Sequence, residues 1–294
     1  LINGLDLTGR RFADTRIVIN GAGSAAIACA DLVKAMGVRH EHVVICDTKG
    51  VVYQGRHEGM NQWKSAHAVP TEARTLAEAL RGADVVFGLS AKGAITKEMV
   101  AAMAPRPIIF AMANPDPEIW PEAVREVRDD AIIATGRSDY PNQVNNVLGF
   151  PYIFRGALDV RASTINDAMK IAAAHAIAGL AREEVPDQVT AADRGKRLRY
   201  GPDYLIPTAG DPRLITAVPV AVARAAMESG VARRPIADLV RYRAELRARL
   251  DPTASSMQLV IDRVRAHPRR LVIAEGEEEK TIGLALAWRN SGLG

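Results

Sequence analysis

Cysteine is scarce in this sequence: its 294 residues include only Cys29 and Cys46. Two cysteines are too few for a disulfide framework, and their spacing is not that of a zinc site. This usage indicates a reducing compartment, and we expect a cytoplasmic protein. Both thiols are expected to be small core residues, one in a helix and one in a strand.

Long apolar runs and a strong charge bias are also missing. No stretch of about 18 apolar residues occurs, and the N-terminus lacks the basic and apolar regions of a signal peptide. The 38 Lys and Arg residues face 34 Asp and Glu residues, for a net charge of +4. We therefore expect a soluble protein with no nucleic-acid and no membrane partner. The basic residues between Arg182 and Arg270 are interpreted as solvated helix faces, with an anionic partner as the alternative.

Metal-ligand patterns and common catalytic motifs are absent too. The six histidines do not recur at ligand spacing, and we expect surface or core roles for them. Adjacent carboxylates such as Asp129-Asp130 do not face each other on a helix, so they are poor candidates for an acid–base pair. Neither a phosphate-binding P-loop nor a Gly-x-Ser-x-Gly turn occurs.

What the chain does have is an alternation of β-branched apolar runs with helical periodicity. This pattern predicts βαβ units and a doubly wound, mostly parallel sheet of the α/β class. We expect strands at residues 16–20, 42–47, 84–90, 107–114 and 131–136. Between them we expect helices at 24–36, 75–80, 96–103 and 121–127.

After Arg137 the pattern becomes helical. Helices are predicted at residues 141–147, 150–162, 164–181, 212–229, 236–250 and 253–267. Residues 269–276 then have the pattern of a buried parallel strand, and 277–293 that of an amphipathic helix. A single βα unit cannot bury both faces of its strand, so we expect it to begin a second α/β domain. The predicted domains are 1–232, a helical connector 233–267, and the start of the second domain, 268–294.

A glycine turn joins the first predicted strand to the first helix, in Asn-Gly21-Ala-Gly23-Ser-Ala-Ala26. Gly21 permits a tight bend, and Gly23 lets the backbone approach a pyrophosphate at the helix N-terminus. Ala26 takes the third glycine position, where helix and strand pack closely. Asp47 ends the second strand about 20 residues later, where a carboxylate binds the adenosine ribose of a dinucleotide. The sequence thus predicts a Rossmann-type dinucleotide site, with an ordinary glycine turn as the alternative. We assign to this site Gly21, Gly23, Ser24, Ala25, Ala26 and Asp47.

Asp47 is followed closely by Thr48, Lys49, Arg56 and Lys64. A carboxylate at this strand end disfavours a 2′-phosphate, whereas nearby cations favour one. The two signals oppose each other. From spacing alone, the three cations could equally form a solvated loop face.

Several longer motifs carry a family resemblance. They are Gly-Ala-Gly-Ser-Ala-Ala at 21–26, Cys-Asp-Thr-Lys-Gly-Val-Val-Tyr-Gln-Gly-Arg at 46–56, Ile-Ile-Phe-Ala-Met-Ala-Asn-Pro at 108–115, and the segment 140–159, which begins Tyr-Pro-Asn-Gln-Val-Asn-Asn. Together they resemble the cofactor-binding domain of bacterial malic enzymes over roughly residues 1–232. The tail Leu-Val-Ile-Ala-Glu-Gly-Glu-Glu-Glu at 271–279 resembles the opening of a phosphate acetyltransferase domain, which follows the malic enzyme portion in the hybrid members.

This resemblance implies a parent protein that converts L-malate to pyruvate and CO2, reduces NADP or NAD, and uses a divalent cation, Mg2+ or Mn2+. It also implies a homo-oligomer, and an acyl-CoA regulator at the following domain. The family's catalytic tyrosine and lysine and its metal-binding carboxylates lie upstream of the glycine motif. We therefore assign no catalytic and no metal-binding residue to this chain and expect it to be inactive alone.

The resemblance also assigns binding residues. Asn114 and Asn146 are implied contacts of malate, and Asn114 also reaches the nicotinamide. The alternative for both is helix capping or turn formation. Ser90, at the end of a strand, is expected to border the dinucleotide, with a plain turn as the alternative. Lys49 and Lys64 lie where NADP-using members often place lysines, so NADP is favoured, while Asp47 keeps NAD open. Thr48, between Asp47 and Lys49, is also assigned to the cofactor site.

Two other functions fit parts of the pattern. A non-catalytic NAD(P)-sensing module would need the dinucleotide site but not the upstream groups. Another Rossmann oxidoreductase, such as an amino-acid dehydrogenase, would share the fold but gives no account of Asn114 together with Asn145-Asn146.

Overall fold

The computed structural model describes residues 1–186, 189–190, 198–250, 260–261, 263–267, 272–274 and 276–290. The chain divides into two compact units, Leu1–Ala237 and Asp238–Gly294, and each is described by itself. The predicted domain limits at 232 and 267 remain a prediction.

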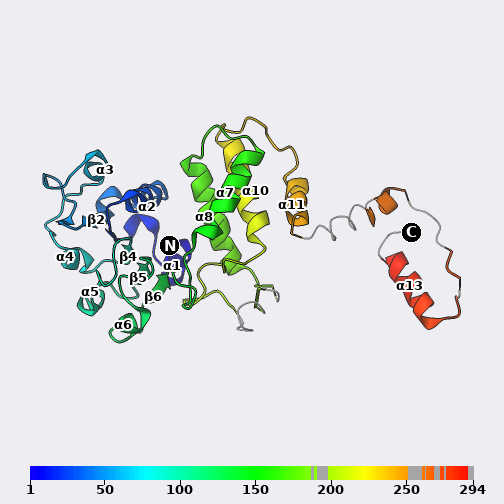
Figure 1. Ribbon diagram of the computed structural model, residues 1–294, viewed down its shortest axis with the longest axis horizontal. Coiled ribbons are helices and arrows are strands. Elements are labelled where there is room, and N and C mark those ends of the chain that lie inside the picture. Colours follow the sequence, from blue (N-terminus) through cyan, green and yellow to red (C-terminus); the bar gives the residue numbers. More distant parts are fainter. Residues whose placement is uncertain are drawn as a thin grey trace. The chain divides into compact units, whose positions relative to one another are not determined.

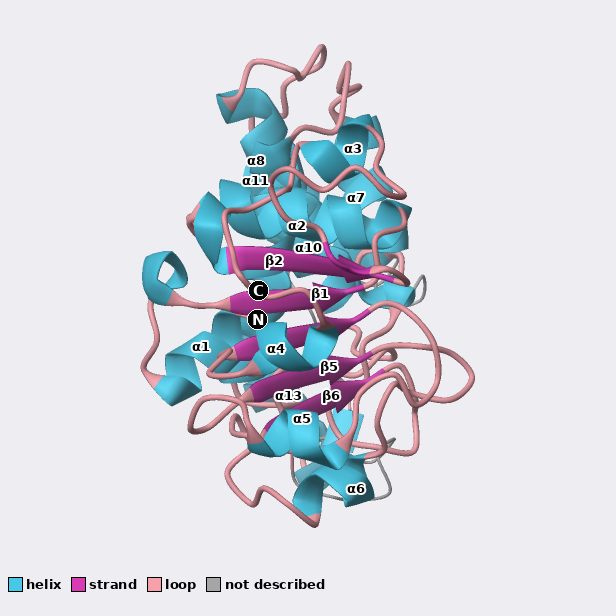
Figure 2. Cartoon of the chain, turned by 90° about the vertical axis from the view of Figure 1, so that its left-hand side faces the viewer, coloured by secondary structure: helices cyan, strands magenta, loops and turns pink. Residues whose placement is uncertain are grey.

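The first unit is built on one six-stranded sheet, drawn in magenta in Figure 2. Its strands are β1 (Ile17–Asn20), β2 (Val43–Asp47), β3 (Gly50–Val51), β4 (Val85–Gly88), β5 (Ile108–Ala111) and β6 (Ile132–Thr135). Their order is β3-β2-β1-β4-β5-β6, and all neighbours run parallel except β2 and β3. The chain leaves β1 towards β2 on one side and later returns to pair β4 on the other. The doubly wound sheet and its five predicted strands are confirmed; β3 was not predicted.

Helices cover both faces of this sheet, which explains why its strands are apolar on both sides. One face packs on α1 (Ile2–Thr8) and α2 (Ser24–Ala35), and the other on α4 (Leu76–Leu80), α5 (Lys97–Ala101) and α6 (Pro121–Arg125). Every residue of β1, β4 and β5 is buried. A shorter helix, α3 (Gln62–Ser65), lies in the loop region after β3.

Three longer helices form a second layer of the same unit: α7 (Phe150–Asp159), α8 (Asp167–Arg182) and α10 (Leu214–Glu228). Figure 1 shows them side by side, and α10 packs on both of the others. A Cβ on Gly156 of α7 would lie 2.6 Å from the carbonyl oxygen of Pro219, so only glycine allows this close helix approach. Buried Asn3 of α1 donates to the carbonyls of Ala178 and Leu205 and so ties this layer to the sheet.

The predicted helix at 141–147 is wrong. Asn142 has a φ of +56° and uses its side chain to hold an irregular segment. Its amide nitrogen donates to the carbonyls of Ile133 and Pro202, and its oxygen accepts from Leu205 N–H. Val144 N–H also donates to the backbone carbonyl of Thr135 at 2.7 Å. These bonds replace helical ones, and only the single turn η3 (Asn146–Leu148) is helical.

The second unit contains α11 (Leu239–Ala248) and α13 (Glu279–Asn290), which lie within two of the predicted helices. Most of the predicted helix at 253–267 lies outside the described residues, and 260–261 and 263–266 are helical. Residues 272–274 and 276, the described part of the predicted strand 269–276, form no strand, and Val272 is 90% exposed. That prediction is wrong for these residues, because a lone strand leaves its backbone groups without partners. A second α/β domain beginning here remains a prediction.

None of the described helices has the length and apolar character that crossing a membrane requires.

Candidate functional site

The glycine turn after β1 lies at the point where the sheet reverses its winding. Gly21 has a φ of +133°, and a Cβ there would lie 2.3 Å from the carbonyl oxygen of Leu89. Gly21 N–H also donates to the backbone carbonyl of Cys46 at 2.8 Å. These constraints explain why only glycine fits this bend, which places the start of α2 at the carboxyl edge of the sheet.

The start of α2 is open to a ligand. A Cβ on Gly23 would meet no atom within 4 Å, and no side chain caps the helix. Ser24 and Ala25 are exposed, whereas Ala26 is buried in the core between helix and sheet. The N–H groups of the first turn therefore point to a space that an anionic group can occupy.

Ser90 joins two strand ends across the switch point. Its hydroxyl accepts from the side-chain amide of Asn20, the last residue of β1, at 2.8 Å. Leu89 N–H donates to the Asn20 carbonyl at 2.8 Å. The turn that contains Ser90 is thus fixed beside the glycine turn, although a contact with a dinucleotide remains a prediction.

Asp47, at the end of β2, is held by two cations. Its carboxylate accepts two hydrogen bonds of 2.8 Å from Arg56 and one of 2.7 Å from Lys64, and Lys49 N–H adds a fourth. Although burial by itself raises the pKa of Asp47, the bonds from Lys64 and Arg56 hold it below its usual value. One carboxylate between two cations leaves this strand end with a net positive charge.

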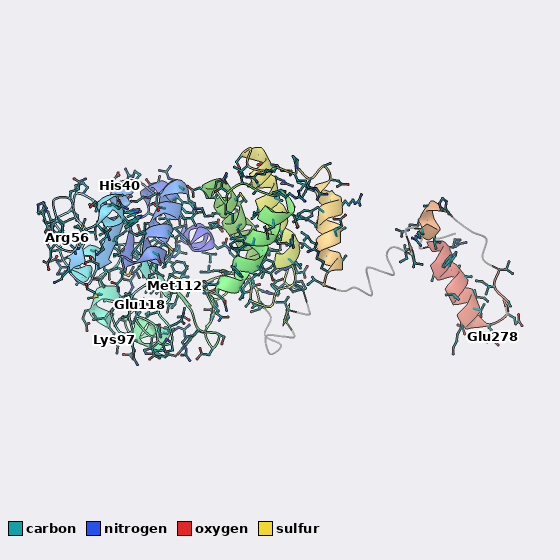
Figure 3. The ribbon with its side chains drawn as sticks, turned by 45° about the horizontal axis from the view of Figure 1, so that its top comes forward. His40, Arg56, Lys97, Met112, Glu118 and Glu278 are labelled. Carbon is teal, nitrogen blue, oxygen red and sulfur yellow. The ribbon has the colours of Figure 1, made fainter. Side chains whose placement is uncertain are left out.

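The solvated-loop interpretation is wrong for Arg56, which is 8% exposed and labelled in Figure 3. Its guanidinium also donates to the carbonyls of Gly50, Val51 and Glu58, so the loop after β2 is built around it. That interpretation holds for Lys49, which is exposed and pairs with Glu58 at 2.7 Å. Thr48 lies exposed in the turn between β2 and β3.

The two asparagines implied as malate contacts both lie beyond the carboxyl end of the sheet. Asn114 follows β5 and is exposed, and a Cβ on Gly136 would lie 2.9 Å from its side-chain oxygen. Asn146 is the exposed first residue of η3, whose segment is bonded to the end of β6 through Val144. Asn145 caps η3, because its side-chain oxygen accepts from Val147 N–H. The exposed Asn146 amide takes no part in this cap and can face a ligand.

A buried acid that the sequence pattern did not reveal lies at the same edge. Glu118 is 0% exposed, and its carboxylate accepts from Ser90 N–H at 2.9 Å and Ala113 N–H at 3.0 Å. It lies in a proline-rich loop, where an acid usually faces solvent. The one available signal is Gly88, a glycine at the end of an otherwise bulky strand, which makes room for the carboxylate.

A polar cluster at the far end of α2 was also missed, because sequence spacing separates its members. Lys34 lies 2.7 Å from Nδ1 of His67 and 3.0 Å from Nδ1 of His40, and Asp31 lies 3.2 Å from Nε2 of His67. No group of three or more His, Cys, Asp or Glu side chains able to hold a metal ion is found among the described residues.

This cluster predicts a pH effect on stability. His67 is 4% exposed, and burial and then the Lys34 charge lower its pKa below 6.5; Asp31 opposes this, and His40 adds to it. The unfolded chain therefore binds a proton near this pH that the folded chain does not, and stability falls as the pH drops below 6.5. We expect His67→Gln to flatten the change in unfolding temperature between about pH 7.5 and about pH 5.5, and exposed His175→Gln to leave it unaltered. Equal slopes for His67→Gln and the unaltered chain would contradict this.

Comparisons with known proteins point to the same kind of domain, one that binds a dinucleotide. A family model described as "Malic enzyme, NAD binding domain" matches residues 1–192. The NADP-dependent malic enzyme of Rhizobium meliloti (strain 1021) is 67% identical over 294 residues, covering all of this chain and 39% of that protein. The NAD-dependent malic enzyme of the same organism is 49% identical over 286 residues, or 97% of this chain and 37% of that protein. The crystal structure of the Entamoeba histolytica malic enzyme superposes with a TM-score of 0.74 at 32% identity, covering 99% of this chain and 57% of that one. The chain thus spans well under half the length of these two curated relatives.

Proposed function

Because the chain belongs to the malic enzyme family, through its NAD-binding domain, we propose that it is the coenzyme-binding part of an NADP-preferring malic enzyme that oxidatively decarboxylates L-malate to pyruvate and CO2. The family membership confirms the resemblance seen in the sequence motifs. The observation that carries the proposal is the uncapped start of α2 behind Gly21 and Gly23, at the switch point of the sheet.

The residues present fit the coenzyme. The first-turn N–H groups of α2 bind its diphosphate. Ser90, just after the neighbouring strand β4, borders the coenzyme. The net positive charge around Asp47 favours a 2′-phosphate over a bare ribose, because the carboxylate that would repel it is already neutralised. Bound there, the coenzyme would supply the acceptor for the hydride that leaves C2 of malate.

Asn114 and Asn146 bind malate in this proposal. A side-chain amide donates hydrogen bonds to a carboxylate without adding charge, so it leaves the attraction between malate and a cation intact. Asn114 lies after the strand that follows β4 in the sheet, which suits it to contact both malate and the nicotinamide end of the coenzyme.

The remaining requirements concern the full-length enzyme. We place the catalytic groups and the site of Mg2+ or Mn2+ outside this chain. We also propose a cytoplasmic homo-oligomer with an acyl-CoA regulator at the domain that follows, on the basis of the motif resemblance.

Calorimetry with the purified chain tests the proposal. We expect saturable binding of NADP+, weaker binding of NAD+, and no malate oxidation unless an upstream segment is supplied. The absence of heat with both coenzymes from a folded sample would refute the coenzyme site. Malate turnover by the chain alone would refute the placement of the catalytic groups.

Lys64→Gln separates recognition of the 2′-phosphate from binding in general. We expect it to weaken NADP+ binding about tenfold and to leave NAD+ binding nearly unchanged, because only NADP+ carries the phosphate that the ammonium would bind. Lys49→Gln is expected to act in the same direction but less, since Lys49 is exposed and screened.

Lys97→Gln is the matched control (Figure 3). Lys97 also pairs with a carboxylate, that of Glu126, but it belongs to α5, a helix that packs on a face of the sheet, and not to the loop around Asp47. Its affinity for both coenzymes should equal that of the unaltered chain. An equal loss for NADP+ and NAD+ in Lys64→Gln would rule out the phosphate contact.

A further inference from the structure

Glu118 is a fully buried carboxylate that the coenzyme and malate contacts above do not use. In the part of the chain that the structure describes, no Lys, Arg or His side chain forms an ion pair with it, and its partners are two backbone N–H groups. Burying a polar acid costs free energy unless its hydrogen bonds compensate, so the bonds to these two amides are what offsets the cost of burying Glu118.

What it holds are the chain segments that leave β4 and β5. One carboxylate oxygen accepts from Ser90 N–H and the other from Ala113 N–H, the residue before Asn114. The backbone carbonyl of Glu118 itself accepts from Ile95 N–H at 3.2 Å. One side chain therefore bridges two turns at the carboxyl edge, where parallel strands end and their ladder bonds stop.

Two glycines make room for this arrangement. A Cβ on Gly88, the last residue of β4, would lie 2.4 Å from the carboxyl carbon of Glu118. A Cβ on Gly136 would lie 2.9 Å from the side-chain oxygen of Asn114. The strand ends on either side of β5 are thus shaped to admit a carboxylate and an amide, and packing as tight as this fixes where both groups lie.

We propose that Glu118 is a positioning residue of the coenzyme and malate site: by binding Ser90 N–H and Ala113 N–H with its two oxygens, it sets the position of Ser90 relative to Asn114. This inference rests on the proposed function, because it is the coenzyme and malate that Ser90 and Asn114 would contact. Glu118 acts through these two residues and touches neither ligand, since it is not exposed.

Glu118→Gln tests the bridge with the least change of shape. A glutamine amide offers one oxygen and one N–H2 group, so it can accept from only one of the two N–H donors and sets a donor against the other. We expect a loss of about tenfold in NADP+ affinity, the scale of one hydrogen bond to a charged group. Glu118→Asp keeps the charge but is one methylene shorter, and we expect it to fail to rescue the affinity.

Two controls separate positioning from general damage. Glu126→Gln makes the same chemical change at an exposed acid and should leave NADP+ affinity unaltered. Leu80→Ala removes buried packing on α4 and should lower the unfolding temperature without a comparable loss of affinity. All affinities are measured well below the unfolding temperature of each variant.

The amide resonances of Ser90 and Ala113 give a readout that needs no coenzyme. In the unaltered chain both amides bind a carboxylate, and we expect Glu118→Gln to move at least one of them strongly upfield by nuclear magnetic resonance. Resonances that move while NADP+ affinity stays the same would overturn the positioning role but not the proposed function. Resonances that do not move would overturn the bridge itself. An unaltered chain that binds no NADP+ would instead refute the proposed function, with the amide resonances still reporting on the bridge.

Discussion

Gly23→Ala is expected to weaken NADP+ binding about a hundredfold while leaving the unfolding temperature of the chain nearly unchanged. Gly23 has an ordinary φ of −81°, and a Cβ there meets no protein atom within 4 Å, so the folded chain tolerates alanine. The added methyl group would occupy the space in front of the first turn of α2, where we place the diphosphate. Calorimetry with NADP+ and thermal unfolding of the same samples measure the two effects.

Two other glycines provide the comparison. Gly179 lies inside α8 and also has no atom near its Cβ position, so Gly179→Ala should retain full affinity and not reduce stability. Gly21→Ala should reduce stability as well as affinity, because its Cβ would collide with the Leu89 carbonyl. If Gly23→Ala binds NADP+ as the unaltered chain does, the diphosphate does not lie at the start of α2.

Asp47→Ala is expected to lower the free energy of unfolding by about 3 kcal/mol, because it leaves the buried Arg56 guanidinium without its carboxylate. The side chains of Arg56 and Asp47 are only 4% and 9% exposed. Chemical denaturation at neutral pH measures the loss. The matched control is Asp139→Ala, which removes an exposed acid paired with Arg137 and should cost less than about 1 kcal/mol.

The same variant gives a pH test with a defined sign. The folded-state pKa of Asp47 lies below its ordinary value of 3.8, so its stabilisation is complete at neutral pH and is lost as the pH falls below 3.8. The difference between Asp47→Ala and the unaltered chain should therefore shrink in acid. Equal losses for Asp47→Ala and Asp139→Ala at neutral pH would show that burial adds nothing to the ion pair.

The sheet could be predicted from sequence because parallel strands are buried on both faces and appear as apolar runs. The run from Ile108 to Ala111 is an example, with every residue buried. The strand β3 has only two residues and forms because the chain turns back on β2, which no periodicity reveals. The segment 141–147 has helical character locally, but the bonds of the Asn142 side chain to Pro202 and Leu205 override it.

The candidate site was predictable only where its chemistry is local. The bend at Gly21 and the helix start at Ser24 follow from adjacent residues, so the motif identified them. Whether Arg56 is solvated or buried depends on the carbonyls that surround it, and these come from the folded loop. Glu118 likewise looks like an ordinary loop acid until the ends of β4 and β5 are brought together.

The outer borders of the sheet also bear on how the chain resists aggregation. On one side β3 pairs with β2, and its Val51 N–H donates to the carbonyl of Arg74. On the other side, the carbonyls of Ile133 and Thr135 on β6 accept from Asn142 and Val144. At both edges of the sheet, backbone groups are thus hydrogen-bonded to nearby loops. Fewer backbone groups remain with which a strand of another chain could pair. Growth into fibrils by strand addition is therefore disfavoured for this unit.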